Sequence, residues 1–123
     1  MYDVTVEASF CASHQLRFAN DELEPLHGHN WEIKARFAGE QLDAQGLLVD
    51  FVDVQAALQR ISRELNHHHL NDLPFFQTVN PSAENVAKWI FDQLEAAGDF
   101  GRFLASVRIL EAPGCVAGYS RSE

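Results

Sequence analysis

The chain has few basic residues, only two cysteines and no long apolar run. Nine Lys and Arg stand against 18 Asp and Glu, so the formal net charge is −9 at pH 7. A negative charge of this size disfavours general binding to nucleic acid or to an anionic membrane, and we expect neither partner. No apolar stretch approaches the roughly 20 residues that cross a bilayer. The sequence therefore predicts a soluble, cytoplasmic protein.

The two cysteines, Cys11 and Cys115, lie far apart and form no Cys-x-x-Cys pair. This spacing fits free thiols in a reduced cytoplasm better than a disulfide framework. The N-terminal segment contains Asp3 and Glu7 and no basic region, so no secretory signal is expected. A chain of 123 residues can bury roughly two thirds of its unfolded surface around one core, and we expect a single domain over residues 1–123.

Two segments near the N-terminus, at 2–14 and about 27–39, alternate between apolar and polar residues as half-buried strands do. The face of the first strand that carries the apolar residues ends with His14. The corresponding face of the second strand begins with His27 and His29. Paired antiparallel, the strands would bring three imidazoles to one point. An isolated His-x-His is more often a surface pair, but the shared parity of all three favours a metal site. Three nitrogen ligands with an open fourth position are typical of catalytic zinc.

Apolar residues recur at helical spacing in two later segments, which predicts two amphipathic helices. The first helix should run from about 51 to 65 with Asp50 as its N-cap. Asn80 as N-cap and Pro81 at the first helical position should start the second, which ends near Gly98. The apolar stripes are Val54, Leu58, Ile61 and Leu65 in the first helix, and Val86, Ile90 and Leu94 in the second.

Two further strands are predicted at about 107–111 and 115–119, joined by a Pro-Gly turn. The order β-β-α-α-β-β predicts an α+β domain in which two helices pack on the apolar face of a four-stranded antiparallel sheet. Apolar residues do not recur at regular spacing in the segments 15–26 and 66–74, which are therefore expected to be loops. Because the sheet has two open edges, we expect it to pair with other copies in a homo-oligomer.

Two carboxylates are candidates for the site. Glu24 lies three residues before His27 and is a candidate base near a metal, although loop carboxylates are usually solvated. Glu111 shares the parity of Val107 and Ile109, so it faces the buried side of its strand. A carboxylate there needs a cationic or multiply donating partner. That partner is either an arginine in a structural ion pair or a ligand with adjacent N–H donors, such as an aminopyrimidinone ring.

The loop at 66–74 contains three consecutive histidines, at positions 67, 68 and 69. Side chains of consecutive loop residues point in different directions, so a second metal site is not expected there. An acid or base role for one of them fits the position better.

Together these segments resemble the 6-pyruvoyltetrahydropterin synthase and 6-carboxytetrahydropterin synthase family. The segments that carry the resemblance are 10–14, 26–29, 46–51, 65–72, 80–85 and the strand with Glu111. The resemblance covers nearly the whole chain and implies the tunnelling fold of that family. It also implies trimers that stack into hexamers as an oligomeric barrel, with sites between subunits.

The resemblance further implies a role for each matched residue. His14, His27 and His29 would hold Zn²⁺, and Glu111 would bind the pterin ring. Ser82 and Glu84 in the matched 80–85 segment would contribute to substrate binding, and His67 would belong to the proton-transfer apparatus.

Two positions depart from the family pattern. The usual cysteine, four residues before the first histidine of His-Gly-His, is replaced by Leu23, and the usual aspartate before His67 is replaced by Asn66. The sequence instead resembles a subgroup with Glu-x-x-His-Gly-His, in which Glu24 takes the place of the cysteine. That subgroup cleaves the side chain of 7,8-dihydroneopterin triphosphate to give 6-hydroxymethyl-7,8-dihydropterin for folate synthesis. The resemblance thus implies Glu24, His67 and Asn66 as catalytic residues of a zinc-dependent lyase.

Two other functions stay open. One is that of the 6-carboxytetrahydropterin synthase of the queuosine pathway, which is favoured by similarity over 67–89 and disfavoured by the missing cysteine. The other is that of a non-catalytic pterin-binding or metal-binding relative. Arg17, Lys34 and Arg36 are the candidates for meeting the triphosphate.

Overall fold

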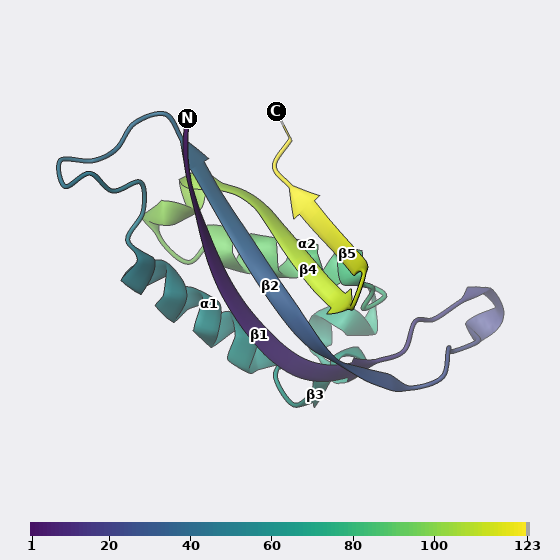
Figure 1. Cartoon of the computed structure of the whole chain (residues 1–123). Coiled ribbons are helices and arrows are strands. Elements are labelled where there is room, and N and C mark those ends of the chain that lie inside the picture. Colours follow the sequence, from purple (N-terminus) through teal and green to yellow (C-terminus); the bar gives the residue numbers. More distant parts are fainter. Residues whose placement is uncertain (123) are drawn as a thin grey trace.

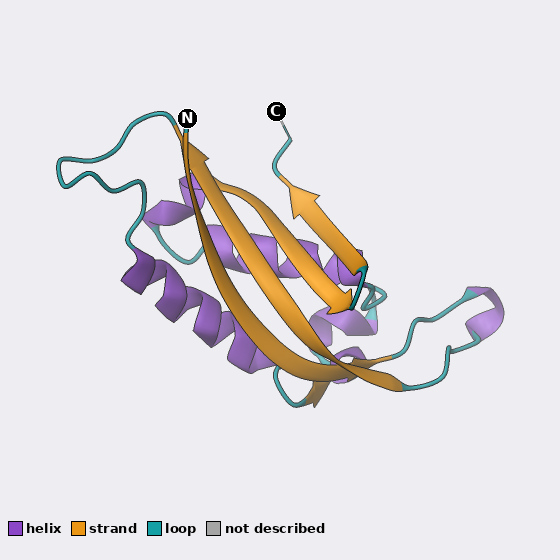
Figure 2. Ribbon diagram, viewed as in Figure 1, coloured by secondary structure: helices purple, strands orange, loops and turns teal. Residues whose placement is uncertain are grey.

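The computed structural model describes residues 1–122, which form one sheet covered on one face by two helices (Figure 1). Figure 2 shows the two helices on the same side of the strands. The helices are α1 (Phe51–Leu65) and α2 (Ala83–Glu95), and short 3₁₀ helices span Ala19–Asp21, Leu70–Asp72, Pro74–Gln77 and Asp99–Phe103. The strands are β1 (Tyr2–His14), β2 (His27–Gly39), β3 (His68–His69), β4 (Leu104–Ala112) and β5 (Cys115–Ser120).

The sheet has five strands in the order β3-β1-β2-β4-β5, and β3 runs parallel to β1. The prediction of a four-stranded antiparallel sheet is therefore wrong in this respect, while the four longer strands are antiparallel as expected. The additional strand has only two residues, which is too short for any alternation to mark it. It forms because the chain leaving α1 passes along the free edge of β1, where His67 N donates to Cys11 O at 2.6 Å.

The core lies between the sheet and the helices. In β2, buried residues alternate with the exposed residues Glu32, Lys34 and Arg36, as the period of two predicts. α1 packs against β1, whereas α2 packs against β4 and β5. No helix within residues 1–122 has the length and apolar character needed to span a membrane. The fully buried core residues include Trp31, Ile33 and Phe37 of β2, Leu58 and Leu65 of α1, Ile90 and Leu94 of α2, and Val107 and Ile109 of β4.

The predicted N-cap residue is confirmed for α1 and is wrong for α2. Asp50 caps α1 as predicted, and its side chain accepts from Val52 N at 2.8 Å. α2 begins later than predicted, because Ser82 and not Asn80 is its N-cap. The Ser82 hydroxyl accepts from Asn85 N at 3.2 Å.

Two asparagine side chains hold the start of the 15–26 loop by pairing with its backbone as a neighbouring strand would. Asn71 accepts from Gln15 N at 2.9 Å and donates to Gln15 O at 2.7 Å. Asn80 does the same for Arg17, at 2.7 and 2.9 Å. This use of Asn80 explains why it is not the cap of α2. Beyond these contacts the loop extends from the end of the sheet as a projecting arm (Figure 1).

Candidate metal and catalytic site

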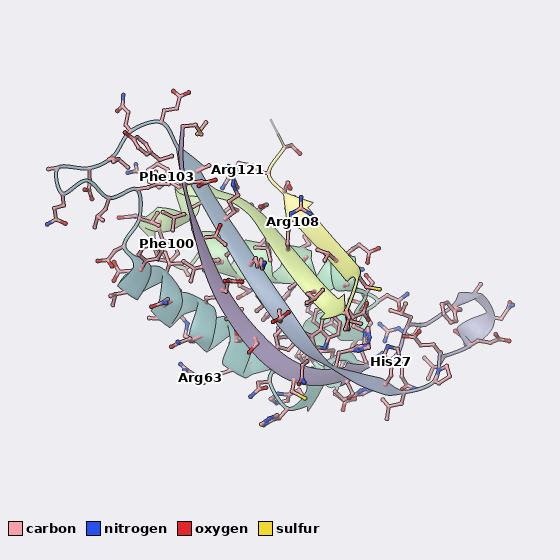
Figure 3. All side chains as sticks on the ribbon, viewed as in Figure 1. His27, Arg63, Phe100, Phe103, Arg108 and Arg121 are labelled. Carbon is pink, nitrogen blue, oxygen red and sulfur yellow. The ribbon has the colours of Figure 1, made fainter. Side chains whose placement is uncertain are left out.

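The three predicted metal ligands lie together at the end of the sheet. His14 is paired directly with His27 across β1 and β2, and Ala12 is paired with His29, so the three imidazoles lie on one face. The ring centroid of His14 is 4.5 Å from that of His27 and 5.5 Å from that of His29. Figure 3 shows His27 at the end from which the projecting loop leaves. Glu111 joins the three histidines in a group whose ligand atoms all lie within 4.8 Å of one another.

Backbone carbonyls orient two of these rings. His14 Nδ1 donates to Pro81 O at 2.7 Å, and His27 Nδ1 donates to Pro25 O at 3.0 Å. A carbonyl oxygen can only accept, so Nδ1 carries the proton in both rings and Nε2 of the neutral ring has a free lone pair. Metal-binding histidines usually have this arrangement, with the second ring nitrogen held by a carbonyl or carboxylate.

The Nε2 atoms of His14 and His29 are buried without a hydrogen-bond partner. Trp31 helps to shield them, since its ring centroid lies 4.9 Å from that of His14 and 5.7 Å from that of His29. Buried polar atoms without a partner are unfavourable and rare in proteins. Lone pairs directed toward one region would be satisfied by a metal ion, and the group therefore fits a metal site.

The carboxylate of Glu111 lies inside this group. Its Oε1 is 2.8 Å from His14 Nε2, 3.4 Å from His29 Nε2 and 4.0 Å from His27 Nε2. Among residues 1–122 the side chains within 4.0 Å that form ion-pair contacts with Glu111 are these histidines and not an arginine, so the alternative of an arginine ion pair is wrong. The sequence prediction of three protein ligands thus missed a fourth candidate.

A local irregularity of β4 positions Glu111. The register between β4 and β5 shifts between Leu110 and Ala112, so Glu111 is an extra residue without a partner on β5. Pairing of β4 with β2 also ends at Leu110. Such bulges bend a strand and interrupt its regular pairing, and they are frequent next to functional sites.

Burial is the main cause of a lowered pKa at His29. Desolvation lowers the pKa of this ring below the ordinary value of 6.5, and His27 and His14 lower it further. The negative charge of Glu111 acts in the opposite direction but does not compensate. A lowered pKa keeps His29 neutral to lower pH, and the neutral ring is the form that binds metal.

We expect the metal-free protein to lose stability when the pH falls below about 6.5. The unfolded chain takes up a proton at His29 at higher pH than the folded chain does. The free energy of unfolding therefore rises with pH between the lowered folded pKa and the unfolded value, and it is lost as the pH falls through that window. Thermal unfolding between about pH 5 and 7.5 measures the slope. His29→Gln should flatten it, with His68→Gln as a control that removes an exposed imidazole, and an unchanged slope in His29→Gln would contradict the expectation.

Glu24 lies at the border of the histidine and glutamate group. Its Oε1 accepts from Leu16 N at 2.9 Å and lies 3.7 Å from His27 Nε2. Two further hydrogen bonds hold its backbone, since Glu24 N donates to Leu16 O at 3.0 Å and Gln15 Nε2 donates to Glu24 O at 3.1 Å. The side chain is 20% exposed. Glu24 is thus not a freely solvated loop carboxylate, and its Oε1 lies beside a candidate metal ligand.

His67 and Asn66 lie at a different edge of the sheet. Both precede β3, and β1 separates β3 from β2. His67 is exposed and has a positive φ of 61°, while the Asn66 side chain accepts from Cys11 N at 2.9 Å. Within one chain, the structure does not bring these two predicted catalytic residues into the group around His27.

The predicted substrate-binding residues lie at the start of α2. The hydroxyl of Ser82 is engaged in the helix cap. Glu84 is exposed, and together with Glu111 and Cys115 it lines a cavity of about 380 Å³. Glu84 and the carboxylate of Glu111 thus face the same cavity. The three histidines and Glu111 are called the metal group below.

The basic residues considered for a triphosphate are engaged elsewhere. Arg17 Nη2 donates to two backbone carbonyls, at 2.5 and 3.0 Å. Lys34 lies 3.7 Å from Glu7, and Arg36 lies 3.1 Å from Asp3, on the face of the sheet opposite the helices. None of the three is directed at the histidine group within one chain.

Sequence reasoning missed the groups that position the site. The carbonyls of Pro25 and Pro81 orient the imidazoles, but a backbone carbonyl leaves no signal in the sequence. A backbone-binding role of Asn71 and Asn80 could be expected in principle, because asparagine in a turn-rich segment often binds backbone groups. The backbone groups that they bind lie 56 and 63 residues away in the sequence and could not be predicted.

Comparisons with known proteins identify relatives over nearly the whole chain. A family model described as 6-pyruvoyl tetrahydropterin synthase matches residues 3–122. The chain is 34% identical to a 6-carboxy-5,6,7,8-tetrahydropterin synthase of Synechocystis sp., over 97% of this chain and 93% of that protein. It is 31% identical to a dihydroneopterin monophosphate aldolase of Pyrococcus furiosus, over 74% of this chain and 73% of the relative. The structure of 6-pyruvoyl tetrahydropterin synthase from Caenorhabditis elegans superposes with a TM-score of 0.84 at 27% identity, covering 99% of this chain and 98% of that one.

Proposed function

Because the chain belongs to the 6-pyruvoyl tetrahydropterin synthase family, we propose that it is a zinc-dependent pterin lyase acting on 7,8-dihydroneopterin triphosphate. The proposed reaction is cleavage of the substrate side chain to 6-hydroxymethyl-7,8-dihydropterin. The observation that carries this proposal is the Glu24 carboxylate, 3.7 Å from His27 Nε2 at the border of the metal group. A carboxylate at this position is the feature of the Glu-x-x-His-Gly-His subgroup.

Zinc fits the donor set of the metal group. It binds imidazole nitrogen and carboxylate oxygen at about 2.0–2.2 Å with tetrahedral geometry, which separates neighbouring donors by roughly 3.3–3.6 Å. The distances from Glu111 Oε1 to the three Nε2 atoms, 2.8, 3.4 and 4.0 Å, spread around this value. When bound, zinc would act as a Lewis acid toward an oxygen of the substrate side chain.

The residues of the chain would divide the remaining work. Glu24 would accept the proton that the side chain of the substrate must lose before its carbon–carbon bond breaks. The 2.9 Å hydrogen bond from Leu16 N holds the Oε1 atom of Glu24 near His27, which favours a base that is in place before the substrate arrives. The three histidines would hold the metal with their Nε2 lone pairs, and Trp31 would limit access of water from the core side.

The relatives support two products. The Pyrococcus furiosus relative is named an aldolase, which favours side-chain cleavage. The Synechocystis relative is named a 6-carboxy-5,6,7,8-tetrahydropterin synthase, and its 34% identity over nearly the whole chain keeps that reaction as the second candidate. The zinc-loaded protein should be incubated with dihydroneopterin triphosphate and with the monophosphate, and the products identified by mass. A hydroxymethyl product supports the proposal, a carboxy product supports the second candidate, and no product from either substrate indicates a non-catalytic relative.

Glu111 is proposed as the partner of the pterin ring. Glu111→Gln keeps the volume of the side chain but removes its charge and replaces one acceptor by a donor. At saturating zinc, pterin binding should weaken by about 1.5–3 kcal/mol, or roughly ten- to a hundredfold. Titration calorimetry measures this, with Glu32→Gln on the exposed face of the sheet as the control. Unchanged affinity in Glu111→Gln would refute the role.

We infer that the chain forms a homo-oligomer, a trimer or a hexamer. β5 forms one edge of the sheet, and β1 is covered by β3 only at Ala12 and Ser13. The projecting loop exposes three large apolar side chains, those of Phe18, Leu23 and Leu26, at 53, 54 and 62%. Association would cover these edges and side chains. It would also allow His67 and Asn66 of one copy to approach the histidine group of another.

Light scattering coupled to size exclusion tests this arrangement, and a species of three or six chains is the expected result. Leu26→Glu on the projecting loop should shift the population toward smaller species, since it would bury a charge in the interface. Glu22→Lys on the same loop changes the charge at an exposed carboxylate and serves as the control. A monomeric wild-type protein at micromolar concentration would contradict the proposal.

A further inference from the structure

We propose that the Glu111 carboxylate closes the metal centre in the substrate-free protein and leaves it when a pterin binds. The fourth coordination position would then open only when the ring of the substrate is in place. This inference rests on the proposed function, since it gives the same carboxylate two alternative partners, the metal and the pterin.

The first part follows from the contacts of Glu111 with the imidazoles. Because His14 Nδ1 donates to Pro81 O, the Nε2 atom of the neutral ring presents a lone pair to Glu111 Oε1 at 2.8 Å. His14 Nε2 makes no hydrogen bond in spite of this short distance. Two electron-rich atoms repel each other at such a separation unless a proton or a metal ion lies between them. With a metal ion in this group, Glu111 would be a fourth ligand beside the three histidines.

The second part follows from what lies on the other side of Glu111. Its side chain is 25% exposed and lines the cavity of about 380 Å³ that Glu84 and Cys115 also line. The carboxylate thus lies between the metal group and an accessible space. A change of side-chain rotamer could move it from one to the other without a movement of the sheet.

The bulge makes such a change feasible. Glu111 is skipped in the register between β4 and β5 and lies beyond the last residue of β4 paired with β2. Its side chain is therefore not enclosed by neighbours on both adjacent strands, in contrast to the fully buried Val107 and Ile109 of the same strand. The chain then turns at Gly114, which has a positive φ of 82°.

A pterin offers what is needed to attract the carboxylate. The 2-amino group and the adjacent ring N–H are parallel donors, and a carboxylate binds such a pair in bidentate fashion. Both bonds require the two carboxylate oxygens to face the ring, whereas Oε1 now faces the three imidazoles at 2.8, 3.4 and 4.0 Å. Binding of the ring would therefore compete with the metal for Glu111 and open the position that an oxygen of the side chain then takes. Coupling of this kind makes a complete active centre dependent on the correct substrate.

The closing role is tested with the Co²⁺-substituted full chain and azide as a small anionic ligand. Azide binding is followed by visible absorption of the metal, without turnover. The affinity for azide should be on the order of tenfold or more higher in Glu111→Ala than in the wild type, because the fourth position is then free. Glu111→Gln is the second variant if the alanine variant does not fold, and Glu32→Ala is the control for loss of one carboxylate. Equal azide affinity in the wild type and the Glu111 variants would overturn the proposal.

The opening role is tested by adding pterin without a C6 side chain to the same samples. This probe should raise the azide affinity of the wild type and leave that of Glu111→Ala unchanged. A wild-type protein that binds the probe, as seen by its fluorescence, without any change in azide affinity would overturn the opening role. Loss of the proposed reaction is a separate result, since neither azide measurement requires a product. Both azide responses could occur although dihydroneopterin triphosphate is not converted. In that case the proposed function is wrong, and the movement of Glu111 from the metal to the pterin is still supported.

Discussion

Replacing Glu24 with alanine should lower turnover by on the order of 10²–10⁴-fold, the usual contribution of a general base. Zinc content and pterin affinity should stay near the wild-type values. Glu24 Oε1 is 3.7 Å from His27 Nε2, so its removal leaves all three imidazoles and Glu111 in the metal group. The measurement is the steady-state rate of product formation from dihydroneopterin triphosphate, together with metal analysis of the same sample. Glu22→Ala, two residues away on the same loop and exposed, is the matched control.

A double variant separates the two reactions considered for this chain. Leu23→Cys with Glu24→Ala restores a thiol at the position where the family usually has one. If the carboxylate directs the reaction toward cleavage, this variant should not regain the hydroxymethyl product. A wild-type protein that makes 6-carboxytetrahydropterin, with no change in Glu24→Ala, would show that Glu24 is not the base. The second candidate function would then be preferred.

Replacing His29 with alanine should remove the metal and leave the fold largely intact. Loss of a partner that only supports a ligand weakens metal binding by about 10–100-fold, so loss of a ligand itself should weaken it at least about a hundredfold. The fold should persist because His29 lies at the end of β2, its side chain is 22% exposed, and the core lies further along the strand. Wild-type protein should hold about one zinc per chain after dialysis.

Metal analysis and circular dichroism of the same samples measure both expectations. His68→Ala, which removes an exposed ring outside the metal group, should keep its zinc. Full zinc content in His29→Ala would remove this residue from the site. A variant that loses both the metal and the fold would show that the metal supports folding, in contrast to the expectation.

Much of the sheet and both helices could be predicted because their patterns are local. The predicted ranges 2–14 and 27–39 coincide with β1 and β2, and 51–65 coincides with α1. Alternation shows which side of a strand is buried, and this parity alone places His14, His27 and His29 on one face. The family and the convergence of the three histidines could therefore be inferred from the amino-acid sequence.

The remaining features depend on contacts between distant parts of the chain. β3 forms only because residues 68–69 pass beside β1, more than fifty positions earlier in the sequence. Asn80 and Ser82 are both suitable caps for α2, and the choice of Ser82 is explained by the pairing of Asn80 with Arg17. Neither outcome leaves a periodic pattern in the sequence.

Glu111 shows most clearly where sequence reasoning stops. Its parity correctly placed it on the buried side of its strand, but that left both an arginine and a ligand as possible partners. The structure instead directs Oε1 to the Nε2 atoms of three histidines on two other strands. The residue types that gather at the end of the sheet follow from the sequence, because burial of a strand face is a local property. Their mutual distances follow from the folded chain alone, because these depend on strand register and on the bulge at Glu111.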